Sequence, residues 1–231
     1  EPTTYYGVGT GVEMALRLHP KRTAGDGDAP GPLRVAVIGL GTGSVAANGL
    51  PGDNFRFYEI NPDVVALSDE DGYFTYLRDS MAKTQVVLGD ARVMMEREFA
   101  ESGSQKFDVM VVDAFSSDAI PVHLLTRECA DVYKQHLQPD GLLAIHISNR
   151  YLDLNPITRA LAVHLNWKAI RIDSDNDEST GVYSSTWIIL TANEEFAADP
   201  EVVQGHYDWD PEDTAPILWT DDFASLFQIM E

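Results

Sequence analysis

The sequence predicts an α/β protein with a Rossmann-like, seven-stranded and mostly parallel sheet that carries helices on both faces. Apolar runs rich in β-branched residues alternate with helix-like segments from residue 33 to about residue 192. Such alternation implies right-handed crossovers between parallel strands. A glycine-rich turn follows the first strand, as in nucleotide-binding folds of this class. The 231 residues, 44% of them hydrophobic, suffice for one large domain with a substantial core.

The expected elements follow one another along this region. Strands are predicted at residues 33–38, 55–58, 85–88, 109–112, 142–147, 169–172 and 186–190. Helices are predicted at residues 62–69, 92–100, 121–137 and 155–165, and a turn at Asp140-Gly141. The chain is thereby divided into an N-terminal segment and loop (1–32), a nucleotide-binding domain (33–192) and a C-terminal docking tail (193–231).

The charge balance disfavours several classes of partner. The chain has 37 acidic and 16 basic residues, which gives a net charge of −21. Such a surface repels nucleic acid and anionic membranes, and it attracts cationic small molecules. An adaptation to solubility or to high salt explains the same balance equally well. The chain starts at Glu1 instead of Met and shows no secretory signal, so we expect it to be part of a longer protein.

Four isolated residues carry weaker expectations. Cys129 is the only cysteine, which excludes an intramolecular disulfide, and it is expected to be a packed side chain in a helix. His146 lies within an apolar strand and is expected to be a hydrogen-bonded core histidine. Tyr5 and Tyr6 either line a nucleoside pocket or only pack.

One acidic loop resembles a metal-binding loop in its spacing. Asp173, Asp175 and Asp177 alternate like the start of a calcium loop. The sixth position is Glu178, where such a loop requires glycine. A solvated loop is therefore expected, and no metal is predicted.

The first turn of the predicted sheet indicates nucleoside binding. The glycines of Gly39-Leu-Gly41-Thr-Gly43 allow a sharp turn and a close approach of a ligand to the main chain, at the start of an expected helix. Twenty residues after Gly39 the second strand ends at Glu59, where an acid can accept both hydroxyls of a ribose. The spacing G-x-G-x-G is typical of proteins that bind the sulfonium nucleoside S-adenosylmethionine (AdoMet).

Acids also follow the third and fourth strands. In Gly89-Asp90-Ala91, the Asp90 carboxylate suits the exocyclic amine of adenine, or the N-cap of the next helix, or both. Asp113 comes directly after the fourth strand, at the edge of the sheet where α/β folds bind their ligands. Asp118 either takes part in the same site or caps a helix that begins at Pro121.

These residues occur in the order found in the spermidine synthase (polyamine aminopropyltransferase) family, which the chain resembles. The resemblance extends over nearly the whole chain, through the segments PTTYYG, FYEINP, GDAR, VVDAFSSDAIPVHLLTRE, HISNRYLDL and WTDD. The resemblance is most specific to the spermidine-synthase-like domains that are fused to bacterial membrane segments. It implies the class I AdoMet-methyltransferase fold, AdoMet as donor substrate, and a cytoplasmic domain of an inner-membrane protein. A homodimer is the expected assembly of such a domain.

The resemblance also implies roles for individual residues. Asp113 would orient a nucleophile beside the sulfonium, with Asp118 as a looser counterpart and Tyr183 at the acceptor site. Glu59 would hold the ribose and Asp90-Ala91 the adenine. The donor-binding loop would be formed by Gly39, Gly41, Thr42 and Gly43.

Three departures from the family bear on the substrates. Thr42 stands where the family has an acid that pairs with the amine of decarboxylated AdoMet, which favours intact AdoMet as the donor. The family's N-terminal β-hairpin domain is expected to be missing. The Asp-Pro-x-Gly-Pro loop of the family is replaced by Asp118-Ala-Ile-Pro. The acceptor is therefore expected to be a cationic amine, or nothing beyond AdoMet itself.

The function expected is that of an enzyme that attacks the side-chain carbon of the sulfonium and releases methylthioadenosine. It would act as a transferase of an aminopropyl or aminocarboxypropyl group, or as a lyase that cleaves AdoMet to a lactone. One alternative is a small-molecule AdoMet methyltransferase. Another is a non-catalytic adenosyl-ligand sensor attached to a membrane protein.

Overall fold

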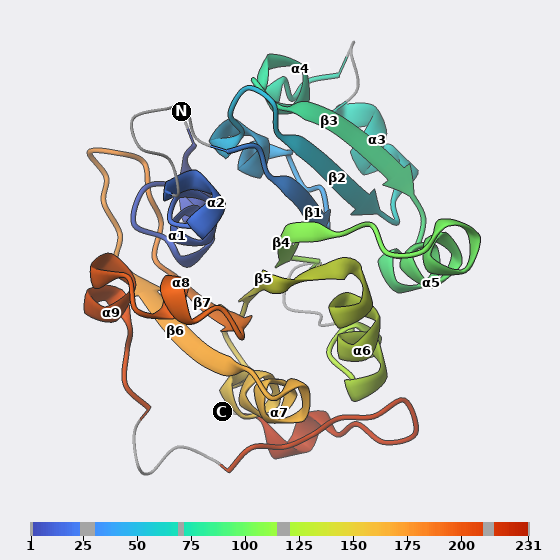
Figure 1. Cartoon of the computed structure of the whole chain (residues 1–231), viewed down its shortest axis with the longest axis vertical. Helices are drawn as coiled ribbons and strands as arrows, with labels where there is room; N and C mark the ends of the chain where they lie inside the picture. Colours follow the sequence, from blue (N-terminus) through green and yellow to red (C-terminus); the bar gives the residue numbers. More distant parts are fainter. Residues whose placement is uncertain (1, 24–30, 69–71, 115–120, 210–214, 231) are drawn as a thin grey trace.

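The strands form a single seven-stranded sheet. The computed structural model describes residues 2–23, 31–68, 72–114, 121–209 and 215–230. The strands are β1 (Arg34–Ile38), β2 (Asn54–Glu59), β3 (Lys83–Leu88), β4 (Phe107–Val112), β5 (Leu137–His146), β6 (Lys168–Ser174) and β7 (Ser185–Thr191). Their order is β3-β2-β1-β4-β5-β7-β6, with β7 antiparallel to both of its neighbours and the other pairs parallel. The predicted fold class and all seven predicted strands are confirmed (Figure 1).

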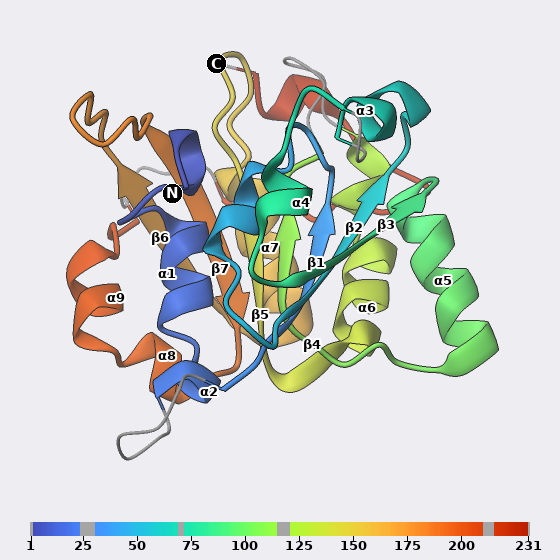
Figure 2. The ribbon, with the colours of Figure 1, turned by 90° about the horizontal axis from the view of Figure 1, so that it is seen from above.

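The helices cover both faces of this sheet. The α-helices are α1 (Gly11–Arg17), α2 (Pro20–Thr23), α3 (Pro62–Leu67), α4 (Tyr76–Asp79), α5 (Ala91–Ser102), α6 (Arg127–His136), α7 (Asn155–Leu165), α8 (Glu194–Ala197) and α9 (Pro200–Gly205). The 3-10 helices are η1 (Thr4–Tyr6), η2 (Ser44–Asn48), η3 (Val122–Leu124) and η4 (Leu226–Gln228). Figures 1 and 2 show α5, α6 and α7 on one side of the sheet and α1 and α9 on the other.

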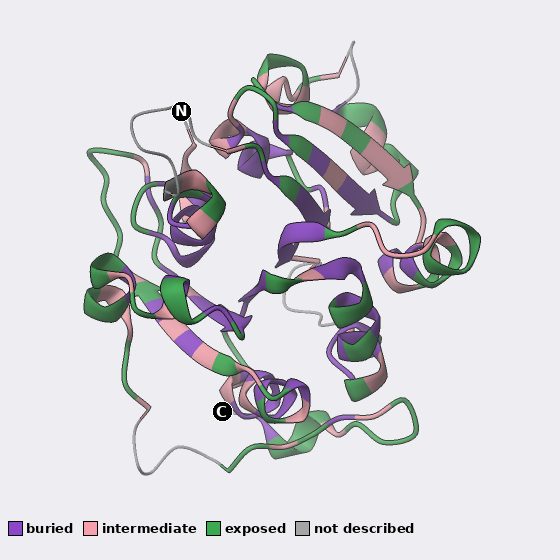
Figure 3. Cartoon of the chain, in the orientation of Figure 1, coloured by how far each residue is buried: buried purple, intermediate pink, exposed green. Residues whose placement is uncertain are grey.

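Two hydrophobic layers result, one on each face of the sheet. In β1, Val35 and Val37 belong to the layer under α1, whereas Ala36 and Ile38 belong to the layer under α5, α6 and α7. Successive side chains of a strand point to opposite faces, so a strand covered on both sides is apolar throughout. All six residues of β4 are buried, which places this strand at the centre of the molecule (Figure 3).

The sequence analysis did not identify α1, although six of its seven residues are buried. The helix begins after Thr10, whose hydroxyl accepts a hydrogen bond from the main-chain N–H of Glu13 at 3.4 Å. It packs on β5, β6 and β7. At Gly11 a Cβ would lie 2.5 Å from the Cβ of Trp187, so glycine permits the close approach of helix and sheet. The N-terminal segment thus packs on the sheet of the 33–192 region, and the proposed domain limits remain a prediction.

Three local expectations were wrong. The helix expected at 121–137 is divided into η3 and α6, because Thr126 caps α6 with a hydrogen bond from the N–H of Cys129 at 3.4 Å. The helix expected after the glycine turn is the short 3-10 helix η2, which ends at Gly49, and not an α-helix. The Asp140-Gly141 pair lies inside β5, where the register with β4 shifts between Phe107 and Val109.

The C-terminal segment returns to the layer of α5, α6 and α7. Trp219 is fully buried in that layer, and its carbonyl accepts a hydrogen bond from the N–H of Arg127 at 2.9 Å. The division of the chain that makes 193–231 a docking tail stays a prediction. Among the described residues, no helix has the length and apolar character that crossing a bilayer requires.

Candidate active site

A cavity of about 570 Å³ opens at the carboxyl ends of β1, β2, β4 and β5. This is the volume of a small-molecule site, and in parallel sheets ligands bind at this edge. Its walls include five residues that the sequence analysis assigned to an adenosyl ligand, namely Gly39, Gly41, Glu59, Asp90 and Ala91. Asp113 lines the same cavity. The structure therefore brings together residues that are up to 74 positions apart in the chain.

Gly39 is required by the close approach of two strand ends. Its φ is +93°, and a Cβ at this position would lie 2.3 Å from the carbonyl oxygen of Asp113. Its main-chain N–H donates to the carbonyl of Tyr58 at 2.9 Å, which fixes the turn between β1 and β2. The main chain of Gly39 and Gly41 can therefore form part of the cavity wall. Two residues of the predicted donor-binding loop, Thr42 and Gly43, are absent from the cavity wall as the described residues form it, and Thr42 is exposed.

Glu59 is a buried carboxylate at the end of β2. One oxygen accepts the N–H of Leu40 at 2.9 Å, and the other accepts the N–H of Asn61 at 2.8 Å. These bonds hold the carboxylate in one orientation at the cavity. Each carboxylate oxygen has a second lone pair, so acceptor capacity remains for the hydroxyls of a ligand. The ribose-binding role stays a prediction that this geometry allows.

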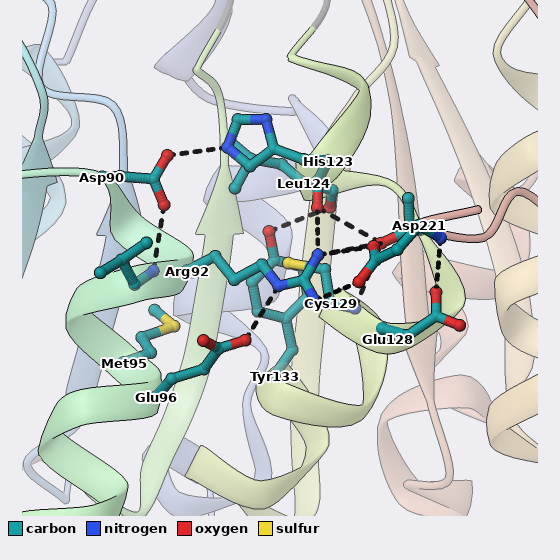
Figure 4. Close-up of polar contacts among 12 residues, drawn as sticks. Asp90, Arg92, Met95, Glu96, His123, Leu124, Glu128, Cys129, Tyr133 and Asp221 are labelled. Atoms are coloured by element: carbon teal, nitrogen blue, oxygen red, sulfur yellow. Dashed lines mark hydrogen bonds and ion pairs between the residues drawn. The ribbon is translucent and has the colours of Figure 1, made fainter. Parts of the chain in front are cut away.

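Asp90 has two partners in the protein. One carboxylate oxygen accepts the N–H of Val93 at 3.0 Å, so Asp90 caps α5 as the alternative interpretation expected. The other oxygen lies 2.7 Å from Nε2 of His123, a cavity residue that the sequence analysis did not single out (Figure 4). His123 comes from η3, so this hydrogen bond joins two separate walls of the cavity.

The Asp113 carboxylate is almost completely buried, with its side chain only 6% exposed. One oxygen accepts a hydrogen bond from the Tyr6 hydroxyl, and the other lies 2.9 Å from Nδ1 of His146. Burial, followed by the charge of Asp113, holds the pKa of Tyr6 well above its ordinary value. Tyr6 is therefore protonated and donates to Asp113 throughout the neutral range.

The imidazole of His146 is held between two aromatic rings. Its centroid lies 4.7 Å from that of Tyr5 on one side and 4.7 Å from that of Trp187 on the other, each pair being stacked. Nε2 lies 2.9 Å from the hydroxyl of Ser148, and that hydroxyl accepts the N–H of Thr186 at 2.8 Å. His146 is buried, as expected of a core histidine, but it also lines the cavity beside Asp113. The expectation that it is only a core residue was therefore incomplete.

Tyr5 and Tyr6 line the cavity and do not merely pack. Tyr183, in contrast, is 58% exposed and does not belong to the cavity wall in the part of the chain that is described. Its predicted role at the acceptor site stays a prediction. Asp118 lies outside the described residues. Within the described ranges, no group of three His, Cys, Asp or Glu side chains could hold a metal ion.

The chemistry of the cavity follows from these side chains. Aromatic rings and a buried carboxylate attract a cation, and the net charge of −21 adds a field of the same sign. An acid at the end of β2 and an acid at the start of α5 suit the two ends of an adenosine. These groups are complementary to the hydroxyls, the exocyclic amine and the positive charge of an adenosyl sulfonium.

Two curated proteins are similar in sequence to about half of the chain. The polyamine aminopropyltransferase of Vibrio vulnificus is 38% identical over 117 residues, which are 49% of this chain and 37% of that protein. A probable polyamine aminopropyl transferase of Bifidobacterium longum is 27% identical over 115 residues, or 48% of this chain and 23% of that protein. About half of the chain is therefore similar in sequence to polyamine aminopropyltransferases. The matched region spans only 37% and 23% of the lengths of these two relatives. No family model matches the chain.

Solved structures of two spermidine synthases and of a methyltransferase-like protein share the fold. The spermidine synthase of Thermotoga maritima superimposes with a TM-score of 0.57 at 14% identity, over 95% of this chain and 68% of that one. A probable spermidine synthase from Corynebacterium glutamicum gives a TM-score of 0.56 at 18% identity, over 81% and 67% of the two chains. Human methyltransferase-like protein 13, in complex with SAH, gives 0.53 at 17% identity, over 87% and 92%. The class I methyltransferase-like fold implied by the resemblance is therefore confirmed.

Proposed function

We propose that the chain transfers the three-carbon side chain of an adenosyl sulfonium to the nitrogen of a small cationic amine and releases methylthioadenosine. The sequence relationship to polyamine aminopropyltransferases supports this reaction type. A new carbon–nitrogen bond forms as the carbon–sulfur bond breaks. The sulfonium becomes a neutral thioether, and the amine gives up one proton. A sulfonium is already an activated leaving group, so the protein mainly has to hold and orient the reactants.

The observation that carries this proposal is the buried carboxylate of Asp113 at the edge of the cavity. Its two oxygens are fixed by Tyr6 and His146, and each keeps a further lone pair for a substrate. A carboxylate in this position attracts the ammonium form of the acceptor and accepts its proton, directly or through water, as the amine attacks. Glu59 and Asp90 would hold the ribose and the adenine of the donor.

We propose an adenosyl sulfonium as the donor and do not choose between AdoMet and decarboxylated AdoMet. Thr42, the residue that favours intact AdoMet, is exposed and lies outside the cavity wall. With intact AdoMet, the transferred group would be aminocarboxypropyl. Intact AdoMet would also permit intramolecular attack, in which its own carboxylate closes on the γ-carbon, expels methylthioadenosine and forms a lactone. The decisive experiment therefore tests both AdoMet and decarboxylated AdoMet as donors.

A second candidate is methyl transfer to a small molecule. The chain covers 92% of human methyltransferase-like protein 13 but only 68% of the Thermotoga spermidine synthase. A methyltransferase would bind the same nucleoside and direct the nucleophile to the methyl carbon. The product would then be S-adenosylhomocysteine.

Product analysis by mass spectrometry separates these reactions. The chain is incubated with AdoMet or with decarboxylated AdoMet, each with and without putrescine or spermidine. Methylthioadenosine that forms only with an added amine supports the proposal, and methylthioadenosine from AdoMet alone supports intramolecular cleavage. S-adenosylhomocysteine supports methyl transfer. If calorimetry detects no binding of AdoMet, decarboxylated AdoMet or methylthioadenosine, the proposed function is wrong.

A further inference from the structure

We propose that His146 is a positioning residue for the cation that reacts in this cavity, and that it acts by holding Asp113 through its Nδ1–H. This role deepens the proposed function and presupposes it. The side chain of His146 is 9% exposed, and the imidazole lines the cavity at the end of β5. Asp113 follows β4, the parallel neighbour of β5, so the two side chains leave the sheet side by side.

The hydrogen bonds around the ring fix its tautomer. An ionised carboxylate can only accept, so Nδ1 of His146 carries a proton and donates it to the Asp113 oxygen 2.9 Å away. Nε2 can then accept the hydroxyl proton of Ser148, 2.9 Å away. The Ser148 oxygen in turn accepts the main-chain N–H of Thr186 at 2.8 Å. The chain of donors thus begins in the main chain of β7 and ends at the carboxylate.

Stacking fixes the orientation of the same ring. Tyr5 and Trp187 lie on its two faces with interplanar angles of 20° each. Trp187 is fully buried, so the ring rests on a wall of the core. Rotation of the imidazole about its bond to Cβ would break both stacked contacts. A donor that is fixed by packing and by hydrogen bonds keeps its partner in one orientation, which is the requirement for catalytic positioning.

The Asp113 carboxylate is therefore fixed from two sides. Tyr6 donates to one oxygen and His146 to the other, while the remaining lone pairs face a bound molecule. A carboxylate held in this way interacts strongly with a charged ligand because little of it is exposed to water. We expect the site to distinguish a positively charged sulfonium from a neutral thioether of nearly the same shape, and His146 to maintain this distinction.

Two substitutions of matched size separate positioning from packing. In His146→Asn the amide nitrogen is attached to Cγ, as Nδ1 is in histidine, so a donor toward Asp113 is kept. In His146→Gln the amide group is one bond further out, near the position of Nε2, where its oxygen can accept from Ser148, so that contact is kept and the donor toward Asp113 is lost. Both variants lose the stacking with Tyr5 and Trp187.

The measurement is the affinity ratio between AdoMet and S-adenosylhomocysteine, determined by calorimetry on the full chain. We expect His146→Gln to reduce this ratio about tenfold and to lower kcat with little change in KM, because a charge-assisted hydrogen bond is lost. His146→Asn is expected to retain most of the wild-type ratio and of kcat. Binding of methylthioadenosine, which is neutral, and the thermal melting curve report whether each variant is folded.

The outcomes distinguish this role from the proposed function. Equal ratios and equal kcat values in the two folded variants would overturn the positioning role, even if the wild type is an active transferase. A wild type that binds AdoMet no better than S-adenosylhomocysteine would overturn the preference for a cation. Absence of any adenosyl binding by the wild type would instead reject the proposed function.

Discussion

Asp113 is the residue on which the proposed reaction depends most directly. Its carboxylate accepts from Tyr6 and lies 2.9 Å from His146 Nδ1. In Asp113→Asn one acceptor oxygen becomes an amide donor, so one of these two donors would face another donor. We expect kcat to fall about a hundredfold or more, because proton acceptance and orientation are both lost. Steady-state kinetics test this, and unchanged turnover in a folded variant would remove Asp113 from the mechanism.

The nucleoside end of the cavity provides the control for that substitution. Methylthioadenosine is uncharged and is proposed to bind through Glu59 and Asp90, which Asp113→Asn does not alter. We expect its dissociation constant to change by less than about threefold, which corresponds to the range of a minor contact. A large loss of methylthioadenosine affinity would mean that Asp113 acts by maintaining the shape of the cavity and not by chemistry.

Cys129 illustrates a reactive residue that burial makes inert. It is fully buried in α6, and burial raises the pKa of its thiol to about 12. The thiolate is the nucleophilic form, so almost none is present at neutral pH. We expect a thiol reagent to leave the folded chain unlabelled at pH 7.5 and to label one site per chain after denaturation. Rapid labelling of the native protein would show that this region of α6 opens readily.

The sequence predicted those site residues that closely follow a recognisable strand. Glu59, Asp90 and Asp113 each come directly after a recognisable strand, or one residue later. Tyr6 contacts Asp113 over 107 positions, and no local pattern indicates such a contact. His146 could have been found, because it ends the strand next to β4 in a parallel sheet and so lies beside Asp113.

At the level of elements, the prediction succeeded for long apolar strands and failed for short, capped helices. The central strand β4 is buried throughout, whereas the edge strands β3 and β6 are partly exposed and were still recognisable from their apolar residues. Helix α1 has only seven residues, and its stability comes from packing on β5, β6 and β7. The antiparallel placement of β7 between β5 and β6 is set by contacts over the whole sheet, which alternation of elements does not reveal.

The C-terminal segment is joined to two helices by one acid. The Asp221 carboxylate accepts two hydrogen bonds from Arg92 at 2.7 and 2.6 Å and one from the Thr126 hydroxyl at 2.8 Å (Figure 4). Its main-chain N–H donates to Glu128 at 3.0 Å. Arg92 belongs to α5 and Thr126 caps α6, so Asp221 connects the first turns of both helices.

We expect Asp221→Asn to lower the free energy of unfolding by about 1 kcal/mol, the upper range for an exposed ion pair, because a bidentate charge pair is lost. The hydrogen bonds from Arg92 lower the pKa of Asp221 to about 2. Its contribution is therefore present above about pH 4 and is lost as the pH falls toward 2. Urea denaturation measures the change, with Asp222→Asn as the matched control. An equal effect of both substitutions would exclude a specific role for Asp221.

For the whole molecule, the charge of −21 opposes the compact state. Acidic side chains repel one another over distances longer than a hydrogen bond, and salt shortens that range to about 8 Å at physiological ionic strength. We expect the melting temperature to rise between 0.02 and 0.5 M NaCl, as calorimetry can show. A lower melting temperature in high salt would mean that local ion pairs outweigh the general repulsion.

The pH dependence of stability near neutrality is expected to follow buried histidines. In His136, at the end of α6, Nε2–H donates to the Met95 carbonyl at 2.9 Å and Nδ1 accepts from the N–H of Gln105 at 3.2 Å. Burial lowers the pKa of this side chain in the folded state, and burial does the same for His19. The unfolded chain therefore binds more protons than the folded chain as the pH falls through about 6.5, so stability decreases toward acid.

The contribution of His136 can be isolated by a double difference. Denaturation curves are measured at pH 7.5 and pH 5.5 for the wild type and for His136→Gln, whose amide can still donate to Met95. The wild type is expected to lose up to about 1.4 kcal/mol more than the variant for each pH unit over which His136 titrates differently in the two states. Carboxylates contribute equally to both proteins and cancel in the comparison. The same pH-dependent loss in both would mean that His136 takes up its proton without disturbing its bonds to Met95 and Gln105.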